Sequence, residues 1–363
     1  MAPVKLGVVG CGAIAQVQHL PNLAGLPEEF EVTTVCDLSP GLARWAAKTF
    51  HVPAAVTDYR RLVRSDDVEA VLLCHSDPKT DAAVAALDAG KHVLIEKPVC
   101  FSLREADAIA DAAVRAGVVA QAGYMKVYDP AFETAKAEVD GMTDIRFVQV
   151  NHLHPDNRLH LSQFRLVRFD DLPAGPVAET HAARKAAVLD AIGEAPEAAV
   201  RAFRTLSGSM IHDLYCLRTM LGMPESVVST EVWNEGRAIS TVLSYSNGAR
   251  CVASWVDLPD LWDFKETLEV YGGDRRVLVS YPTGFARGIL STVVLHEIDE
   301  AGETSTRRPA VAWESPFVRE LRHFHACIAG QEACRTPVAE ARDDIRLIID
   351  ITRTYMARRP ISA

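Results

Sequence analysis

The chain has 363 residues, of which 48% are hydrophobic and 24% charged, and it carries a formal net charge of −10 at pH 7. These values are typical of a globular protein, and the length favours two domains over a single core. The acidic balance argues against nucleic acid or an anionic membrane as a partner, and no apolar run reaches the ~18–20 residues of a membrane helix, so we expect a cytoplasmic protein.

The first 125 residues alternate short apolar segments with Ala-rich segments in a regular order. The apolar segments are expected to be strands, at Val4–Val9, Val32–Cys36, Ala70–Cys74, His92–Ile95 and Val118–Ala122. Helices are expected between them, for instance over Ala82–Ala89 and Leu103–Ala116. Such alternation predicts right-handed crossovers and a parallel, doubly wound α/β sheet over residues 1–125.

A different pattern follows over residues 126–363. A helix is expected over Asp129–Val139, a strand over Ile145–His154 and an Ala-rich helical insert, a solvated pair or a lid, within residues 160–206. The later strand-like runs are Val227–Trp233, Ile239–Tyr245, Arg250–Val256, Thr267–Tyr271, Arg276–Val279 and Thr292–Ile298. They predict an α+β domain with a large, mostly antiparallel open sheet for substrate binding and oligomerisation. The final helices, Phe317–Ile328 and Ala339–Met356, could pack on either domain.

The first predicted strand runs into a glycine-containing turn, Gly10-Cys11-Gly12-Ala13-Ile14-Ala15. This is a GxGxxA form of the dinucleotide fingerprint: Gly10 allows the tight turn, Gly12 admits the pyrophosphate, and the small Ala15 lets the helix approach the sheet. The amides at the helix start, around Ala13 and Ile14, would hold the pyrophosphate. A tight turn without a ligand is the alternative, but the strand–turn–helix context favours a Rossmann dinucleotide-binding domain.

The second predicted strand ends at Asp37. A carboxylate at this position can bond both ribose hydroxyls of NAD, and its charge repels the 2′-phosphate of NADP. The alternative role is a helix cap, because Ser39-Pro40 follows, and Arg44 in the next helix could help to hold a phosphate. NAD is therefore the predicted cofactor, with NADP less favoured.

The segment from Ala86 to Pro98, ALDAGKHVLIEKP, ends an apolar strand in two opposite charges and a proline. Charges and a proline also occur where a strand simply leaves the core. Together with the glycine turn and Asp37, however, the segment resembles the Gfo/Idh/MocA family of glucose–fructose oxidoreductases and inositol dehydrogenases. The resemblance extends to the closing helices and implies an NAD-dependent dehydrogenase or reductase acting on CH–OH groups. It implies that Lys97 is catalytic beside the nicotinamide, before a cis proline, and that Glu96 lines the cofactor side.

The resemblance also implies a proton acceptor on a helix within Ser207–Leu214. Oxidising a secondary alcohol requires a cation to stabilise the developing alkoxide, which Lys97 would supply, and a base, for which histidine is suited. His212 falls at the family's histidine, but the aspartate expected four residues earlier is Gly208. The missing carboxylate would have raised the imidazole pKa, and a packed helix histidine without a catalytic role is the alternative.

Further substrate and cofactor contacts are predicted from the resemblance. Ser76 follows the third predicted strand and would touch the cofactor, although the surrounding loop departs from the family's pattern. Tyr124 and Lys126, at the entry to the second domain, would face the substrate, and exposed surface is the alternative for Lys126. His154 and Asn157 would offer polar substrate contacts, or simply mark the exit of a strand.

No metal site is predicted. His152 and His154 share a strand face, but the sequence shows no third ligand. The eight cysteines are scattered without a CxxC pair, which favours buried free thiols.

Three functional readings remain open from the sequence. The first is oxidation of a small polyhydroxylated cyclitol, sugar or sugar derivative, and the second is reduction of a ketone or imine in the opposite direction. The third is a non-catalytic NAD(P)-binding sensor on the same fold, which the glycine at position 208 favours and Lys97 with His212 opposes. A homodimer or homotetramer is expected through the exposed face of the second sheet, around Trp233, Tyr245 and Trp255.

Overall fold

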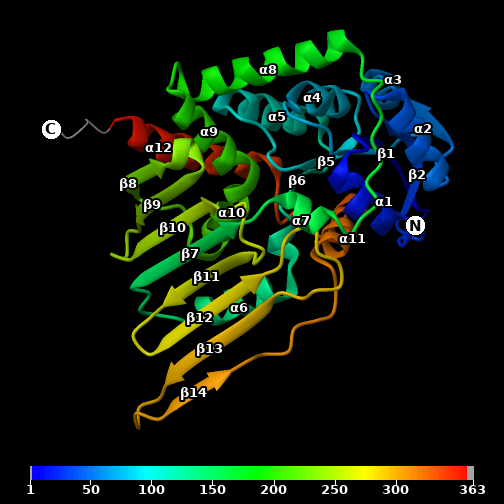
Figure 1. Ribbon diagram of the computed structural model, residues 1–363. Helices are drawn as coiled ribbons and strands as arrows, with labels where there is room; N and C mark the ends of the chain where they lie inside the picture. The colour runs from blue at the N-terminus through cyan, green and yellow to red at the C-terminus, as the bar shows by residue number, and fades with distance from the viewer. Residues whose placement is uncertain (1, 358–363) are drawn as a thin grey trace. The chain divides into compact units, whose positions relative to one another are not determined.

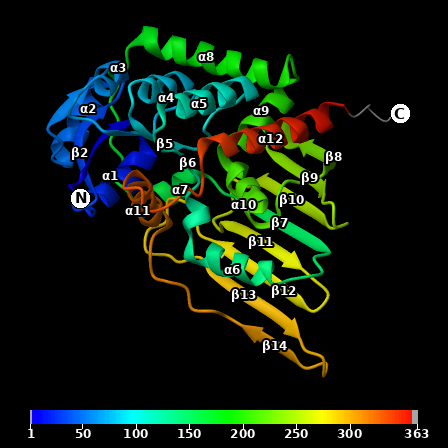
Figure 2. The ribbon, with the colours of Figure 1, turned by 180° about the vertical axis from the view of Figure 1, so that it is seen from behind.

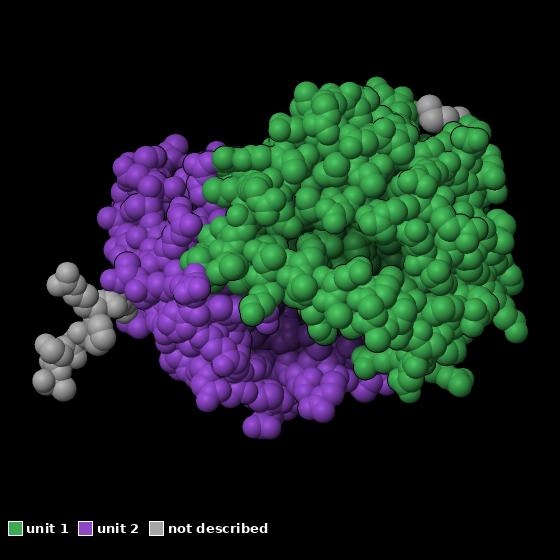
Figure 3. Space-filling view, turned by 90° about the horizontal axis from the view of Figure 1, so that it is seen from above, with its two compact units in different colours: residues 1–124, 164–193, 317–345 green, residues 125–163, 194–316, 346–363 purple. Residues whose placement is uncertain are grey.

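The computed structural model describes residues 2–357, and the chain separates into two compact units (Figure 3). Unit 1 comprises residues 1–124, 164–193 and 317–345, and unit 2 comprises residues 125–163, 194–316 and 346–363. Two segments that follow residue 125 in the sequence, residues 164–193 and 317–345, are therefore part of unit 1. The assignment of nucleotide binding and substrate binding to separate domains stays a prediction.

Unit 1 contains a six-stranded parallel sheet in the order β3-β2-β1-β4-β5-β6 (Figure 1). Its strands are β1 (Val4–Val9), β2 (Phe30–Cys36), β3 (Ala54–Val56), β4 (Ala70–Leu73), β5 (His92–Glu96) and β6 (Ala120–Gly123). The strand order reverses at β1, so the carboxyl ends of β1 and β4 flank the point where such sheets bind ligands. The predicted parallel, doubly wound sheet is confirmed.

Some helices of unit 1 begin at a residue whose side chain caps the helix. The helices of this unit include α2 (Pro40–Thr49), α3 (Tyr59–Val63), α4 (Thr80–Asp88), α5 (Leu103–Ala116), α8 (Ala174–Ile192), α11 (Pro316–Ile328) and the short η5 (Val338–Glu340). In α5, Ser102 and Glu105 form a reciprocal capping box at the start, and Gly117 ends the helix with φ of 64°. Each cap satisfies backbone groups that the helix itself leaves unpaired.

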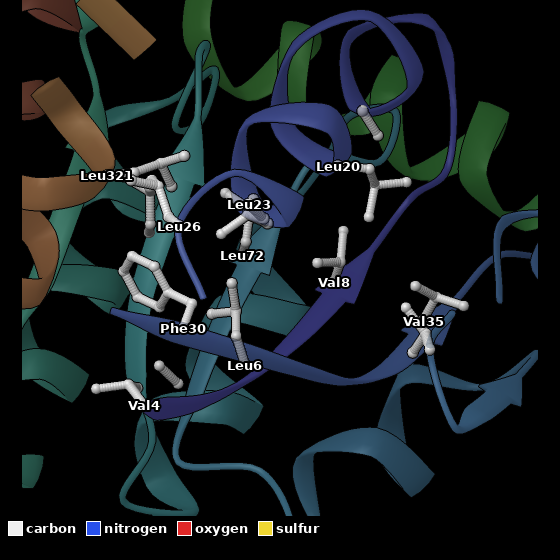
Figure 4. Close-up of a cluster of buried hydrophobic side chains, with 14 of the residues drawn as sticks. Val4, Leu6, Val8, Leu20, Leu23, Leu26, Phe30, Val35, Leu72 and Leu321 are labelled. Atoms are coloured by element: carbon white, nitrogen blue, oxygen red, sulfur yellow. The ribbon is translucent and has the colours of Figure 1, made fainter. Parts of the chain in front are cut away.

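The core of unit 1 packs one face of the parallel sheet against helices from both ends of the chain (Figure 4). Leu6, Val8 and Leu72 from the sheet are fully buried. Leu321 and Phe324 of α11 join them, and the ring of Phe324 stacks on Phe30 at 6.4 Å between centroids. This packing explains why a C-terminal helix belongs to the N-terminal unit, since its apolar face is buried there.

The helix that follows the glycine turn contains a π-helical turn, η1 (Ala15–His19), before it continues as α1 (Leu20–Ala24). Pro21 has no backbone N–H, so the regular hydrogen bond to the carbonyl one turn earlier cannot form. The wider π turn accommodates the proline without ending the helix.

Unit 2 contains an eight-stranded sheet in the order β14-β13-β12-β11-β7-β10-β9-β8. The strands are β7 (Phe147–His154), β8 (Ser226–Trp233), β9 (Ala238–Ser244), β10 (Arg250–Asp257), β11 (Lys265–Tyr271), β12 (Arg275–Tyr281), β13 (Thr292–Ile298) and β14 (Thr304–Arg307). All neighbours are antiparallel except β7 and β10, which run parallel. The predicted mostly antiparallel sheet is confirmed.

Unit 2 also contains helical segments before, between and after its strands. They include η2 (Met125–Tyr128), α6 (Pro130–Asp140), α7 (Asn157–Leu161), α9 (Glu197–Thr205), η3 (Leu206–Met210), α10 (Ile211–Leu221) and η4 (Asn234–Gly236), and α12 (Ala341–Met356) starts in unit 1 and ends in unit 2. Helix α6 packs against β12 and β13 (Figure 2). Among the described residues, no helix combines the length and the hydropathy needed to cross a membrane.

Candidate active site

The glycine turn at the carboxyl end of β1 has the geometry that its sequence predicts. Gly10 has a φ of 94°, and a side-chain Cβ there would lie 2.4 Å from the backbone nitrogen of His75. Only glycine fits such a position. A Cβ at Gly12 would meet no atom within 4 Å, so the face above this residue is open to a ligand. The half-buried Ala13 and Ile14 follow, and Ala15 is fully buried. This turn fits a dinucleotide pyrophosphate.

Asp37 lies at the carboxyl end of β2, directly beside that turn. Its two carboxylate oxygens accept hydrogen bonds from the backbone amides of Cys11 and Ser39, at 2.8 and 2.9 Å. Burial raises the pKa of Asp37, and the two amide bonds work against this rise. The carboxylate is thus fixed in orientation next to the fingerprint. This placement is the one that the ribose-binding role requires.

Two further residues at this site were not predicted. The side-chain amide of Gln16 donates to the carbonyl oxygens of Cys11 and Val167, at 2.9 and 3.0 Å, and accepts from the amide of Val167 at 3.0 Å. Asp171 accepts hydrogen bonds from the Ser39 hydroxyl and from the Gly41 amide. Both contacts join positions more than 100 residues apart in the sequence, so no local pattern could have indicated them.

The Glu96–Lys97–Pro98 segment follows β5 at the same edge of the sheet. The Glu96 carboxylate is buried, contacts His19 Nε2 at 2.6 Å and accepts the Lys97 amide at 3.0 Å. Burial opposes its ionised form, but His19, Lys97 and Lys79 outweigh this and hold the pKa of Glu96 low. Glu96 therefore orients the Lys97 backbone, and the half-buried Lys97 precedes a cis bond to Pro98.

The loop after β4 contacts this segment through a lysine that the sequence did not single out. Lys79 is buried, pairs with Asp77, and donates to the carbonyl oxygen of Pro98 at 3.1 Å. Burial and the Lys79 charge lower the pKa of His75 to about 4, so His75 is neutral near pH 7. Ser76, the predicted cofactor contact, is exposed at the tip of the loop. The role of Ser76 stays a prediction.

Glu320 in α11 is fully buried, and neither of its carboxyl oxygens has a hydrogen-bond partner among the described residues. Burial and the neighbouring Glu96 charge raise the pKa of Glu320 well above its ordinary value. An ionised carboxylate without partners would be very costly there. Burial therefore favours the protonated, neutral form of this side chain in the folded protein.

We expect Glu320→Gln to stabilise the protein increasingly as pH rises. Below the range in which glutamate ordinarily ionises, the carboxyl is neutral in both states and the difference is small. Above it the unfolded chain releases a proton that the folded chain keeps, so wild type loses up to about 1.4 kcal/mol per pH unit. Urea unfolding at about pH 5 and about pH 8 measures this difference, with the exposed Glu28→Gln as control. A difference independent of pH would contradict the prediction.

In unit 2, His212 lies in the first turn of α10 and is half-buried. Its Nδ1 lies 2.8 Å from the hydroxyl of the buried Tyr215, and that oxygen also accepts the Lys126 amide at 3.2 Å. A tyrosine hydroxyl can accept one hydrogen bond and donate another, so it can bond the Lys126 amide and His212 Nδ1 at the same time. Tyr215 therefore orients the imidazole. From the sequence, an aspartate at position 208 was expected to do so, but that residue is Gly208.

The predicted one-turn spacing between positions 208 and 212 is altered by η3, a π-helical turn. A π turn holds more residues than an α turn, so residues four apart no longer lie directly above one another. A Cβ at Gly208 would meet no atom within 4 Å. The position can therefore take a larger side chain.

A buried charge network lies next to His212. Lys126 pairs with Glu266, and His152 Nδ1 lies 2.8 Å from Asp213 and 3.6 Å from Glu266. All four side chains are at most 3% exposed. Burial disfavours the Lys126 ammonium, but Glu266 and Asp213 outweigh this and raise its pKa. Lys126 is thus a buried cation that also lies over the Tyr281 ring, at 4.5 Å, and not exposed surface.

The remaining predicted substrate residues differ in exposure. Tyr124 is buried at the end of unit 1, His154 is half-buried, and Asn157 is exposed at the start of α7. Burial and the neighbouring His152 lower the pKa of His154 to about 4. His154 stacks on Trp255 at 5.6 Å between centroids. It therefore presents a neutral ring, and contacts from these residues to a substrate stay predictions.

Two groups of side chains among residues 2–357 have the spacing of metal ligands, His152–Asp213–Glu266 and His323–Cys327–Cys334. In the first, the Lys126 ammonium already neutralises Glu266. In the second, Glu332 and the Arg335 amide occupy both ring nitrogens of His323, at 2.8 and 3.1 Å. All eight cysteines are free thiols. In the second group, both imidazole nitrogens of His323 are therefore already engaged.

A parallel sheet with a glycine fingerprint after its first strand and an acidic residue after its second defines a dinucleotide-binding domain of the Rossmann type. Residues 4–124 match the sequence model of the Gfo/Idh/MocA family, described as an oxidoreductase family with an NAD-binding Rossmann fold. The resemblance predicted from the sequence is therefore confirmed over residues 4–124, where the chain is similar to this family.

Curated relatives match over a similar part of the chain. Inositol 2-dehydrogenase of Salmonella typhimurium is 34% identical over 140 residues, which cover 38% of this chain and 41% of that enzyme. The inositol 2-dehydrogenase/D-chiro-inositol 3-dehydrogenase of Shouchella clausii is 35% identical over 140 residues, 38% of this chain and 40% of the relative. The match thus spans about two fifths of either enzyme.

Solved structures match over nearly the whole chain. A putative NADPH-dependent oxidoreductase from Desulfitobacterium hafniense has a TM-score of 0.78 and 15% identity, covering 99% of this chain and 98% of that one. A 3-ketoreductase from Actinomadura kijaniata, in complex with NADP and TDP-benzene, has a TM-score of 0.72 and 18% identity, covering 97% and 98%. At these identities the matches show the fold.

Proposed function

We propose that the chain is an NAD(H)-dependent oxidoreductase that moves a hydride between nicotinamide and a secondary alcohol or ketone of a cyclitol, sugar or sugar derivative. One observation carries this proposal: the open glycine turn, Asp37 and Lys97 follow β1, β2 and β5 at the same carboxyl edge of one parallel sheet. Sheets of this kind bind dinucleotides at that edge. The names of the inositol dehydrogenase relatives support the substrate class.

Lys97 is proposed to stabilise the developing alkoxide. When bound, NAD supplies the hydride acceptor for the carbinol carbon. The Lys97 ammonium would donate a hydrogen bond to the substrate oxygen as negative charge builds there, which is the kind of contact that lowers a barrier most. Glu96 and Lys79 hold the backbone on either side of Lys97, so the side chain starts from a fixed position.

His212 is proposed to accept the hydroxyl proton through Nε2, or to return it when a ketone is reduced. The contact between Nδ1 and the Tyr215 hydroxyl supports this assignment, because it fixes the orientation of the imidazole ring. Polar contacts from Tyr124, His154 and Asn157 to the substrate belong to the same proposal. Lys126 would contribute through its charge, since its ammonium is committed to Glu266.

NAD rather than NADP is the proposed cofactor, with Asp37 as the residue that selects it. We expect Asp37→Ala to weaken NAD binding about tenfold or more, because a hydrogen bond to a charged group contributes ~1.5–3 kcal/mol. The preference over NADP should narrow in the same variant. Calorimetric titration of both dinucleotides measures the change, with the exposed Asp66→Ala as control. Tighter binding of NADP than NAD by wild type would overturn the assignment.

The cytoplasmic location and the homodimer or homotetramer also belong to this proposal. On β8 of the large sheet, Val228 and Trp233 are 54% and 48% exposed. Tyr245 and Trp255, also expected at the interface, are buried within the described chain. On β8, Val228 and Trp233 are therefore the exposed apolar residues that support self-association.

A further inference from the structure

Residues 164–171 form an irregular segment, here called the strap, that belongs to unit 1 although it lies far from the fingerprint in sequence. Gln16, on the helix that follows the glycine turn, bonds both main-chain groups of Val167 in the middle of the strap, each at 3.0 Å. The strap therefore lies against the dinucleotide-binding turn, before α8 begins.

The strap ends in a carboxylate placed at the start of α2. One oxygen of Asp171 accepts the hydroxyl of Ser39, and the other accepts the amide of Gly41 at 2.6 Å. Ser39 is the N-cap of α2 and gives its backbone amide to Asp37. Asp37 and Asp171 thus hold the same residue from two sides. The negative charge of Asp171 lies where the exposed amides of α2 favour an anion.

The start of α2 is also where the 2′-phosphate of NADP would need hydrogen-bond donors. A phosphate on the adenosine ribose extends past the acidic residue after β2, and an arginine nearby commonly accommodates it. Here the hydrogen bond from Ser39 lowers the pKa of the Asp171 carboxyl most, the Gly41 amide adds to this, and the charge of Arg44, one turn into α2, contributes least. Asp171 therefore occupies the Ser39 hydroxyl and the Gly41 amide, which could otherwise donate to a phosphate. Its negative charge also offsets the positive charge of Arg44.

The close approach of the strap depends on a glycine. A Cβ at Gly41 would lie 2.6 Å from the Phe169 ring and 2.7 Å from the Asp171 carboxylate. Gly41 is in the first turn of α2, where alanine is compatible with a helix. The strap and the start of α2 are thus fitted to each other without room for a methyl group.

We propose that Asp171, held in place by the strap, is a second NAD-selecting residue that excludes the 2′-phosphate of NADP. The proposal rests on the dinucleotide-binding function proposed above and deepens it. Asp37 bonds the ribose hydroxyls, and Asp171 occupies the phosphate position beside them. A carboxylate from the 164–193 segment thereby adds a repulsive element against the competing cofactor.

The test is calorimetric titration of the full chain with NAD and NADP, for wild type, Asp171→Asn and Gly41→Ala. Asp171→Asn should tighten NADP binding about tenfold while changing NAD affinity little. Gly41→Ala should act in the same direction, because it displaces the strap without removing a charge. Asp170→Asn, an exposed neighbour with the same loss of charge, should change neither affinity. Thermal unfolding of each variant checks that it is folded. If Asp171→Asn does not fold, the result for Gly41→Ala decides the test.

Each other outcome contradicts the proposal in its own way. If wild type prefers NAD and the ratio is unchanged in folded Asp171→Asn and Gly41→Ala, Asp37 selects alone and the inference fails while the proposed function stands. If both dinucleotides bind more tightly in the variants by the same factor, the strap competes with the cofactor and does not select it. If wild type binds neither dinucleotide, the proposed function fails and the inference fails with it.

Discussion

Lys97→Ala is expected to lower kcat by about two to three orders of magnitude, because it removes a donor that acts on charge developing in the transition state. NAD affinity should stay close to that of wild type, since Glu96 bonds the backbone amide at position 97 and not the lysine side chain. The measurement is steady-state NADH formation on the best substrate of a cyclitol and sugar panel, with NAD affinity measured separately.

Lys48→Ala is the matched control for that result, because Lys48 is an exposed lysine of the same unit. It should leave both turnover and NAD affinity unchanged. Near wild-type turnover in Lys97→Ala would remove Lys97 from the catalytic assignment. A large loss of NAD affinity without a loss of kcat would give it a binding role instead.

His212→Ala should lower kcat/KM by about two to four orders of magnitude and abolish the acid limb of its pH profile, because the general base is lost. Tyr215→Phe should keep the acid limb and lose about fivefold in rate, since one orienting hydrogen bond contributes about 1 kcal/mol. A Cβ at Gly208 meets no atom within 4 Å, so Gly208→Asp adds a negative charge one π turn before His212 and should move the acid limb to higher pH, because a nearby carboxylate favours the imidazolium.

His181→Ala, in the exposed face of α8, is the control for general effects of removing a histidine. If His212→Ala retains both the rate and the acid limb, another residue is the base. Because Tyr215 also accepts the Lys126 amide, Tyr215→Phe must be accompanied by a measurement of stability. A rate loss without a loss of stability supports the orienting role.

The parts of the fold that could be predicted are those whose signals are local. The strand Val4–Val9 and the helix Leu103–Ala116 have the predicted bounds. The ends of a buried strand and of a capped helix are marked by residue types within a few positions of each end. Two short strands, Ala54–Val56 and Thr304–Arg307, were not predicted. Both lie on sheet edges and are largely exposed, so they lack an apolar pattern.

The candidate site divides in the same way. Gly10, Gly12, Asp37 and Lys97 could be assigned from motifs in which each residue stands next to a predicted strand. Asp171 and Tyr215 could not, since their partners are set by tertiary packing. The two π turns also escaped prediction, because a helical pattern does not reveal one extra residue in a turn.

The central claim is that this chain oxidises a polyhydroxylated substrate with NAD, and NADH formation tests it most directly. The experiment incubates the full chain with saturating NAD and a panel of cyclitols, sugars and sugar derivatives, alongside Lys97→Ala. The account predicts NADH formation by wild type with at least one member of the panel. With Lys97→Ala the rate of NADH formation should be lower by about a hundredfold or more. Wild type that binds NAD and yet forms no NADH with any member would contradict the account and favour a non-catalytic NAD-binding sensor.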